Sequence, residues 1–185
     1  MRVIAGTAKG RNLQSVPGDS TRPITDRVKA ALFSILTSQE MVEGCRFLDL
    51  FGGTGAVGIE ALSRGAAQAV FCERDRAALH TLQRNLASTD LADRGRVVSG
   101  DAFGYLARPD LSPFDVIYVA PPQYHELWLR ALRMIDARPE LVQDHGQVII
   151  QVFPKEWAEP DLTHLTLLDR RQYGSTALFF FSRKE

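Results

Sequence analysis

A glycine-rich turn near the middle of the chain has the clearest chemical meaning. Segment 46–58 reads RFLDLFGGTGAVG, in which Gly53, Gly55 and Gly58 fit the pattern G-x-G-x-x-G. Glycines at a strand-to-helix corner let the backbone turn tightly and approach a bound ligand. Glu73 follows Gly53 by 20 residues, the spacing at which an acidic side chain accepts hydrogen bonds from ribose hydroxyls. The segment therefore predicts a site for a nucleoside-containing cofactor.

The charge of Asp49 distinguishes between two such cofactors. A carboxylate at the end of this strand repels the pyrophosphate of a nicotinamide dinucleotide but attracts the ammonium and sulfonium groups of S-adenosylmethionine. Glu73 and Asp101 follow the next two expected strands, and ligands of open α/β sheets bind at such strand ends. Alone, Asp49 or Asp101 can be read as a loop or cap residue, but together the three acids favour S-adenosylmethionine. The contacts expected from this interpretation are Asp49, Phe51, Gly52, Gly53, Gly55, Glu73, Asp101 and Ala102.

A proline pair follows the fourth expected strand, in segment 116–124, VIYVAPPQY. Two consecutive prolines fix the backbone and cannot continue a strand ladder. One interpretation is a simple strand terminator. The other is a rigid loop that presents backbone carbonyls to a substrate while Tyr124 stacks on an unpaired base. On the second interpretation the candidate catalytic residues are Ala120, Pro121, Pro122 and Tyr124.

Alternating strand and helix signals surround these residues. Strands are expected at 46–51, 69–73, 96–99, 114–119 and 147–153, and helices at about 26–38, 56–63, 75–88 and 125–137. This alternation is typical of βαβ units and predicts a Rossmann-like α/β fold with a parallel sheet.

The two ends of the chain depart from this alternation. Residues 163–172 and 176–182 are strand-like around a short turn, so a terminal hairpin should make the sheet mixed at one edge. Residues 2–16 predict a small hairpin of two short strands around Gly6 and the turn at 8–11.

The composition is that of one globular domain. The 185 residues are 45% hydrophobic and carry 22 basic and 22 acidic side chains. No apolar run reaches the length of a membrane span and no apolar block opens the chain, so we expect no membrane segment and a cytoplasmic location. The two cysteines and four histidines form no disulfide framework and no pattern typical of a metal site.

Charge is unevenly distributed in this neutral chain. The first 30 residues hold six lysines and arginines against two aspartates, which indicates a local contact with a polyanion. The alternative is a solvated, flexible terminus.

Four segments give the chain a resemblance to the RsmD-type bacterial methyltransferases, which act on the N2 amine of a guanine in 16S ribosomal RNA. The segments are 1–11, 21–28, 48–58 and 60–65. The resemblance implies a class I S-adenosylmethionine-dependent fold with a seven-stranded mixed sheet, a basic hairpin extension at 1–20 and a methyltransferase domain at 21–185. It also implies that the partner is ribosomal RNA or a small-subunit assembly particle.

The resemblance further assigns site residues outside the glycine-rich turn. The residues it places near the methionine end of the cofactor are Thr21, Arg22, Pro23 and Thr25. Those it places against RNA are Arg2, Lys9 and Arg11.

One departure from this family affects the chemistry. Where amine methyltransferases of this kind read Asp- or Asn-Pro-Pro-Tyr or -Phe, this chain reads Ala120-Pro-Pro-Gln-Tyr124. The hydrogen-bond acceptors left in the loop backbone are the carbonyls of Ala120 and Pro121. The enzyme either uses the Pro121 carbonyl, Gln123 or a neighbouring group, or the chain is a weakened or inactive homologue that binds RNA or assists ribosome assembly. A methyltransferase acting on DNA or another nucleic-acid amine, and a nicotinamide-dependent oxidoreductase, stay open as alternatives.

Overall fold

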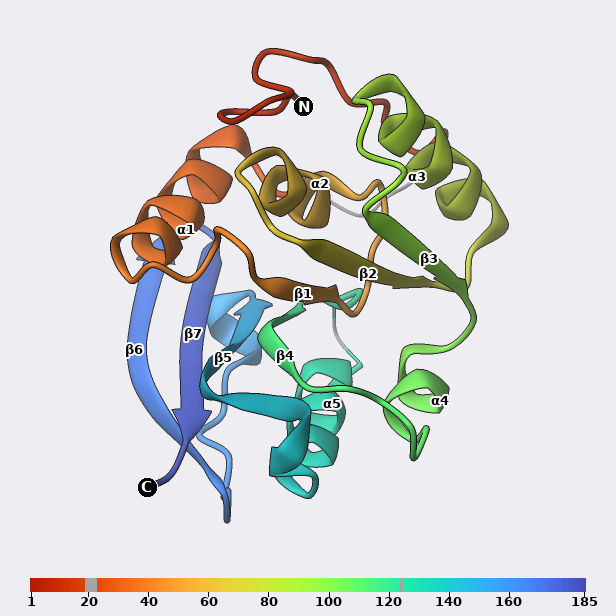
Figure 1. Cartoon of the computed structure of the whole chain (residues 1–185). Helices are drawn as coiled ribbons and strands as arrows, with labels where there is room; N and C mark the ends of the chain where they lie inside the picture. Colours follow the sequence, from red (N-terminus) through yellow and green to blue (C-terminus); the bar gives the residue numbers. More distant parts are fainter. Residues whose placement is uncertain (19–22, 124) are drawn as a thin grey trace.

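The computed structural model describes residues 1–18, 23–123 and 125–185. Within these ranges, seven strands form one sheet in the order β3-β2-β1-β4-β5-β7-β6, visible through the middle of the molecule in Figure 1. The first five strands are parallel, whereas β7 pairs antiparallel with β5 and β6. The strands are β1 (Arg46–Asp49), β2 (Gln68–Glu73), β3 (Gly95–Ser99), β4 (Phe114–Val119), β5 (Val142–Val152), β6 (Leu165–Tyr173) and β7 (Thr176–Arg183). The predicted mixed sheet with a terminal hairpin is confirmed.

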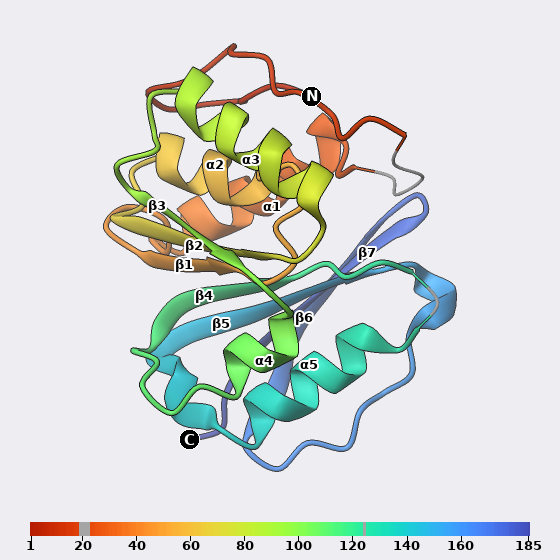
Figure 2. The same ribbon diagram turned by 90° about the vertical axis from the view of Figure 1, so that its right-hand side faces the viewer.

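Helices cover both faces of this sheet in a three-layer arrangement (Figures 1 and 2). One face carries α1 (Asp26–Ser38), α2 (Ala56–Ser63) and α3 (Arg76–Ser88), and the other carries α4 (Ala102–Leu106) and α5 (Leu127–Asp136). Two short 3₁₀ helices, Pro139–Leu141 and Pro154–Glu156, flank β5. Among the described residues, no helix is both long and apolar enough to span a bilayer.

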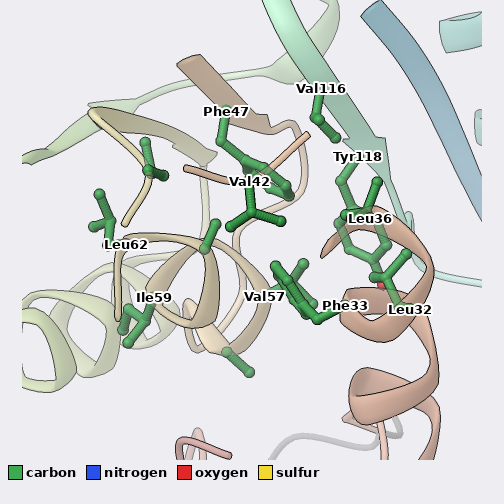
Figure 3. Close-up of a cluster of buried hydrophobic side chains, with 14 of the residues drawn as sticks. Leu32, Phe33, Leu36, Val42, Phe47, Val57, Ile59, Leu62, Val116 and Tyr118 are labelled. Atoms are coloured by element: carbon green, nitrogen blue, oxygen red, sulfur yellow. The ribbon is translucent and has the colours of Figure 1, made fainter. Parts of the chain in front are cut away.

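Successive side chains of each strand point to opposite faces of the sheet, and they form two hydrophobic clusters, one beneath each layer of helices. In the cluster under α1–α3, Leu32 and Leu36 of α1 lie near Tyr118 of β4, and Val57 of α2 lies beside Phe33 (Figure 3). The cluster under α4 and α5 takes the intervening strand positions, such as Ile117. Because the core strands are buried on both faces, they read as continuous apolar runs in the sequence.

Several elements differ in length from the sequence expectation. β1 ends at Asp49, two residues early, because the chain turns there into the glycine-rich segment. β5 begins at Val142, five residues early, and a register shift between Phe114 and Val116 of its partner accommodates the extra length. The helix α4 was not predicted; it has five residues, and its N-cap side chain, Asp101, accepts a hydrogen bond from the amide of Gly104.

The N-terminal segment differs most. The predicted hairpin is present in a shortened form: Arg2 and Asn12 make one antiparallel bridge, and the amides of Val3 and Leu13 donate to the carbonyls of Arg11 and Met1 over 2.9 and 3.0 Å. Its backbone also bonds to α2, for example through the amide of Ala8, which donates to Ser63 Oγ over 2.9 Å. Gly6 has a φ of +86°, and a Cβ there would lie 1.8 Å from the carbonyl oxygen of Ser63. The proposed division of the chain near residue 20 stays a prediction.

A buried carboxylate, Glu60 on α2, holds this segment in place. Its oxygens accept from the amides of Ile4 and Ala5 at 3.0–3.2 Å, and they pair with Lys29 Nζ at 3.5 Å and Arg64 Nε at 2.9 Å. Glu60 is 0% and Lys29 1% exposed, and burial lowers the pKa of Lys29 while Glu60 opposes that shift. Lys29 Nζ also donates to the carbonyl of Arg2 over 2.6 Å. Glu60 therefore joins α1, α2 and the N-terminal segment.

Replacing Glu60 tests this assignment. Glu60→Ala leaves the Lys29 ammonium buried without its carboxylate and frees two amides, so we expect a loss of about 3–5 kcal/mol in the free energy of unfolding, measured in urea. The control is Asp90→Asn, which removes the exposed partner of Arg11 and should cost at most about 1 kcal/mol. Equal losses for the two variants would contradict the role of Glu60.

Candidate functional site

The topology brings the three predicted acids to one edge of the sheet. Asp49 ends β1 and pairs in register with Phe71 of β2. Glu73 ends β2 and pairs with Ser99 of β3, and Asp101 follows two residues later. Because β1, β2 and β3 are parallel neighbours, their carboxyl ends meet at the same edge. The sequence prediction that these acids lie at successive strand ends is confirmed.

Asp49 is the most unusual group at this edge. Its side chain is 2% exposed, and one oxygen, Oδ2, accepts from the amide of Gly58 at 3.2 Å. The other oxygen, Oδ1, has no hydrogen-bond partner within the described residues. Burial raises the pKa of Asp49 well above its ordinary value, the Gly58 amide opposes the shift, and the charge of Glu73 adds to it. An unpartnered buried carboxylate oxygen fits a cationic, hydrogen-donating ligand group such as an ammonium.

The glycine-rich turn is held close to the neighbouring strand. The amide of Gly52 donates to the carbonyl of Cys72 over 2.8 Å, and the amide of Gly53 donates to Glu73 Oε2 over 2.9 Å. Gly53 has a φ of +54°, yet a Cβ there would meet no heavy atom within 4 Å. The turn thus leaves open space at Gly53, as a backbone that receives a ligand requires.

Glu73 and Asp101 each have a structural role and can still accept further hydrogen bonds. Glu73 Oε1 accepts from the amides of Arg74 and Asp75 at 2.9 Å, so this carboxylate fixes the turn between β2 and α3. Asp101 Oδ2 accepts from Gly104 N at 3.0 Å, which makes Asp101 the cap that the sequence analysis weighed as an alternative. A carboxylate has about four acceptor positions, so neither role prevents contact with cofactor hydroxyls.

Sequence reasoning missed Asn85, which supports the turn from beneath. Asn85 lies on α3 and is 0% exposed. Its Nδ2 donates to the carbonyls of Thr54 and Gln14 at 2.9 and 3.0 Å, and its Oδ1 accepts from the Gln14 amide at 2.8 Å. The sequence contains a sign of this role: Asn85 lies seven positions after Ala78, so a polar residue falls on the apolar face of the predicted helix.

The candidate catalytic loop leaves β4 at this same edge. Ala120 is partly buried against the cluster under α1–α3, Pro121 is partly buried and Pro122 is exposed. On the same face of the sheet, the hydroxyl of Tyr118 donates to Gln151 Oε1. Tyr124 lies outside the described residues.

The residues assigned near the methionine end are described only in part. Thr21 and Arg22 lie outside the described residues. Pro23 and Thr25 are exposed at the start of α1, where Thr25 Oγ1 caps the helix by accepting from the amide of Val28 at 3.2 Å.

The three basic residues assigned to RNA lie on the N-terminal segment, and two of them have acidic neighbours. Arg2 Nε lies 3.5 Å from Asp26, and Arg11 lies 2.9 Å from Asp90. Lys9 is exposed. Exposed pairs of this kind contribute little to stability and exchange readily for other anions.

The edge contains hydrogen-bond donors and acceptors for a ligand. In the described ranges no group of three or more histidines, cysteines, aspartates or glutamates is placed to hold a metal ion. Both cysteines are buried. The chemistry that this edge supports is therefore binding and orientation of a cationic nucleoside ligand beside a carbonyl-rich loop.

The fold and this edge define a Rossmann-like protein of the class I methyltransferase type. A solved structure titled "Putative methyltransferase yhhF from Escherichia coli" superposes with a TM-score of 0.87 at 30% identity, covering 100% of this chain and 98% of that one. The predicted fold is confirmed.

The family is shown by sequence. The model of the family described as "Conserved hypothetical protein 95" matches residues 1–182, and the chain belongs to this family. "Putative rRNA methyltransferase YlbH" of Bacillus subtilis (strain 168) is 35% identical over 187 residues, covering 100% of both chains. "Ribosomal RNA small subunit methyltransferase D" of Escherichia coli (strain K12) is 40% identical over 122 residues, covering 66% of this chain and 60% of that one. These matches confirm the resemblance to RsmD-type methyltransferases.

The raised pKa of Asp49 predicts a pH-dependent cost to folding. The folded protein holds this proton to a higher pH than the unfolded chain, whose carboxyl has the ordinary value of 3.8. Stability from Asp49 is therefore greatest below that value and falls as pH rises toward the folded pKa. The asparagine in Asp49→Asn cannot ionise. The free energy of unfolding of this variant minus that of the native chain should therefore increase as pH rises from 3.8 to the folded pKa, and then stay constant. Urea unfolding at a series of pH values measures the difference, and a difference independent of pH would contradict it.

Proposed function

We propose that this protein transfers a methyl group from S-adenosylmethionine to the exocyclic N2 amine of a guanine in small-subunit ribosomal RNA. The single observation that carries the cofactor is the buried, unpartnered Oδ1 of Asp49 at the carboxyl end of β1. The names of the relatives support the reaction and the RNA class. The substrate is ribosomal RNA, either free or within a small-subunit assembly particle.

The chain's own residues bind and orient the cofactor in this proposal. Asp49 Oδ1 accepts from the ammonium, Glu73 accepts from the ribose hydroxyls and the backbone at Gly53 approaches the bound molecule. Asp101 and Ala102 lie beside the adenine, while Thr25 and its neighbours at the start of α1 lie near the methionine end. S-adenosylmethionine supplies a methyl group already activated by the sulfonium.

Orientation is then the main contribution of the protein to the rate. Holding two reactants in line can contribute roughly 7–11 kcal/mol to the barrier reduction. The proline pair fixes the backbone of the loop after β4, so the carbonyl of Pro121 can accept from the target amine. The basic N-terminal segment contacts the RNA through Arg2, Lys9 and Arg11.

A second candidate function follows from Ala120. Because this position lacks an acceptor side chain, the chain can instead be an RNA-binding or ribosome-assembly protein that keeps its cofactor site. Transfer of label from S-adenosylmethionine to unmodified small-subunit RNA or assembly particles separates the two functions. Methyl incorporation supports the enzyme, whereas cofactor binding without incorporation on any of these substrates supports the binding protein.

Gly53→Ala tests the cofactor site with a matched control. A Cβ at Gly53 enters the open space where the cofactor backbone contact is proposed, which should weaken binding by about tenfold to hundredfold, from the roughly 1–3 kcal/mol cost of overpacking. Gly174→Ala is the control, because Gly174 has a similar φ of +59° and the same lack of neighbours. Calorimetric titration with S-adenosylhomocysteine measures both affinities. Unchanged binding in Gly53→Ala would remove the turn from the site.

Ala120→Asp tests the loop. A carboxylate at this position adds a charged acceptor for the target amine, and such a hydrogen bond contributes about 1.5–3 kcal/mol, or roughly tenfold or more in rate. Single-turnover methyl incorporation measures the gain, while cofactor affinity should stay within about twofold because the loop lies beyond Asp49. Unchanged incorporation would show that a carboxylate at position 120 adds no acceptor that the target amine lacks.

A further inference from the structure

The loop after β4 supplies only one of the two hydrogen-bond acceptors that the target amine requires. A guanine amino group has two N–H donors, and its nitrogen lone pair is delocalised into the ring. Accepting hydrogen bonds from both N–H groups holds the nitrogen in one orientation and favours its lone pair. The Pro121 carbonyl can accept one of these bonds, whereas the Ala120 side chain cannot accept the other.

The strand beside β4 carries a polar side chain at the level of Ala120. Val119 of β4 pairs in register with Ile150 of β5, so Gln151 lies beside Ala120, one residue past the last paired positions. Side chains alternate along strands. Tyr118 and Ile149 both belong to the cluster under α1–α3, and Ala120 packs against it. Gln151, two residues after Ile149, therefore projects from the same face as Ala120.

Tyr118 fixes the orientation of this glutamine. Its hydroxyl donates to Gln151 Oε1, so the amide oxygen is held on the side of β4. Tyr118 is 3% exposed, and burial together with the charge of Asp49 raises the pKa of Tyr118 well above its ordinary value. The hydroxyl therefore stays protonated and donates throughout the neutral range. An amide oxygen has two lone pairs, so Oε1 can accept a second hydrogen bond while Tyr118 occupies the first.

The same group of strands connects this pair to the cofactor edge. Tyr118 of β4 pairs in register with Asp49 of β1, whose Oδ1 is the buried, unpartnered atom described above. Asp49, Tyr118 and Gln151 thus lie on the adjacent strands β1, β4 and β5, and Ala120 follows Tyr118 by two residues, directly after the end of β4 and beside Gln151. The glutamine is partly exposed, as a group that meets a substrate must be.

We propose that Gln151 takes the place of the missing acceptor at position 120, its Oε1 accepting a hydrogen bond from the target amine while Tyr118 acts as its positioning residue. This inference rests on the proposed methyl transfer to a nucleic-acid amine. In that step the nitrogen lone pair forms the new N–C bond, the S–C bond breaks, and its electron pair stays on sulfur as a neutral thioether. The methylated nitrogen then releases one proton to solvent. Gln151 orients the amine and takes no proton.

Gln151→Leu is the direct test, with Gln147→Leu as its matched control. Gln147 lies on the same strand and the same face, four residues earlier, and its Nε2 donates to Gln39 Oε1 over 3.1 Å. We expect Gln151→Leu to lower single-turnover incorporation by about tenfold to hundredfold with unchanged affinity for S-adenosylhomocysteine. Gln147→Leu should leave both quantities within about twofold. Gln151→Glu, which keeps an acceptor in place, should retain activity.

A double variant distinguishes an acceptor from a merely structural glutamine. If an aspartate at position 120 supplies the acceptor, Gln151→Leu should cost less than about threefold in the Ala120→Asp background, although it costs at least tenfold in the native chain. A structural glutamine would cost the same in both backgrounds, and that result would overturn the inference. Tyr118→Phe should lower incorporation by a smaller factor than Gln151→Leu, again without changing cofactor affinity.

The outcomes also separate this inference from the function on which it rests. No incorporation by the native chain on RNA or assembly particles, despite cofactor binding, would overturn the proposed function. Incorporation by the native chain that is unchanged in Gln151→Leu would overturn the role of Gln151 alone. A loss in Gln123→Leu without a loss in Gln151→Leu would overturn it as well, and would place the acceptor on the loop.

Discussion

The buried carboxylate of Glu60 is the interaction on which the arrangement around the site depends. It accepts hydrogen bonds from two backbone amides of the N-terminal segment, and it pairs with the ammonium of Lys29 on α1 and with the guanidinium of Arg64, the residue that follows α2. An isolated charge at this depth would be very unfavourable, and these partners compensate for its lost hydration. The helix that follows the glycine-rich turn is thereby fixed to both segments that carry the proposed cofactor and RNA contacts outside the sheet. Because the site is already held in one arrangement, it loses little conformational entropy when substrates bind.

Asp49 shows the opposite use of a buried acid. Glu60 is fully partnered within the chain, whereas Asp49 has one oxygen without a partner among the described residues. A fold gains nothing in stability from such an atom, so its place at the end of a central strand is best understood through a ligand. The proposed cationic cofactor would compensate the burial that raises the pKa of Asp49, and binding and ionisation of this group would then favour each other.

The sequence predicted the parts of the molecule that depend on local patterns. Apolar runs and the glycine-rich turn gave the order of strands and helices, and the spacing of Asp49, Glu73 and Asp101 gave the edge at which they meet. The N-terminal hairpin is less regular than predicted, because tertiary hydrogen bonds to α2 hold part of its backbone beside the one antiparallel bridge. Asn85 and Gln151 were missed for the same kind of reason. Their roles come from partners 71 and 33 residues away in the chain, and no local pattern records such contacts.

The distribution of charge bears on how a neutral chain meets a polyanion. Two of the three basic residues proposed to contact RNA have acidic neighbours, Asp26 and Asp90, so in the proposed function RNA phosphates would compete with carboxylates for Arg2 and Arg11. Each exchange returns an exposed carboxylate to solvent, which costs little. Few counterions are then released overall, so the dependence of RNA affinity on salt should be shallow compared with that of strongly basic RNA-binding proteins. In the proposed function, recognition would then rely more on the shape of the RNA than on its charge.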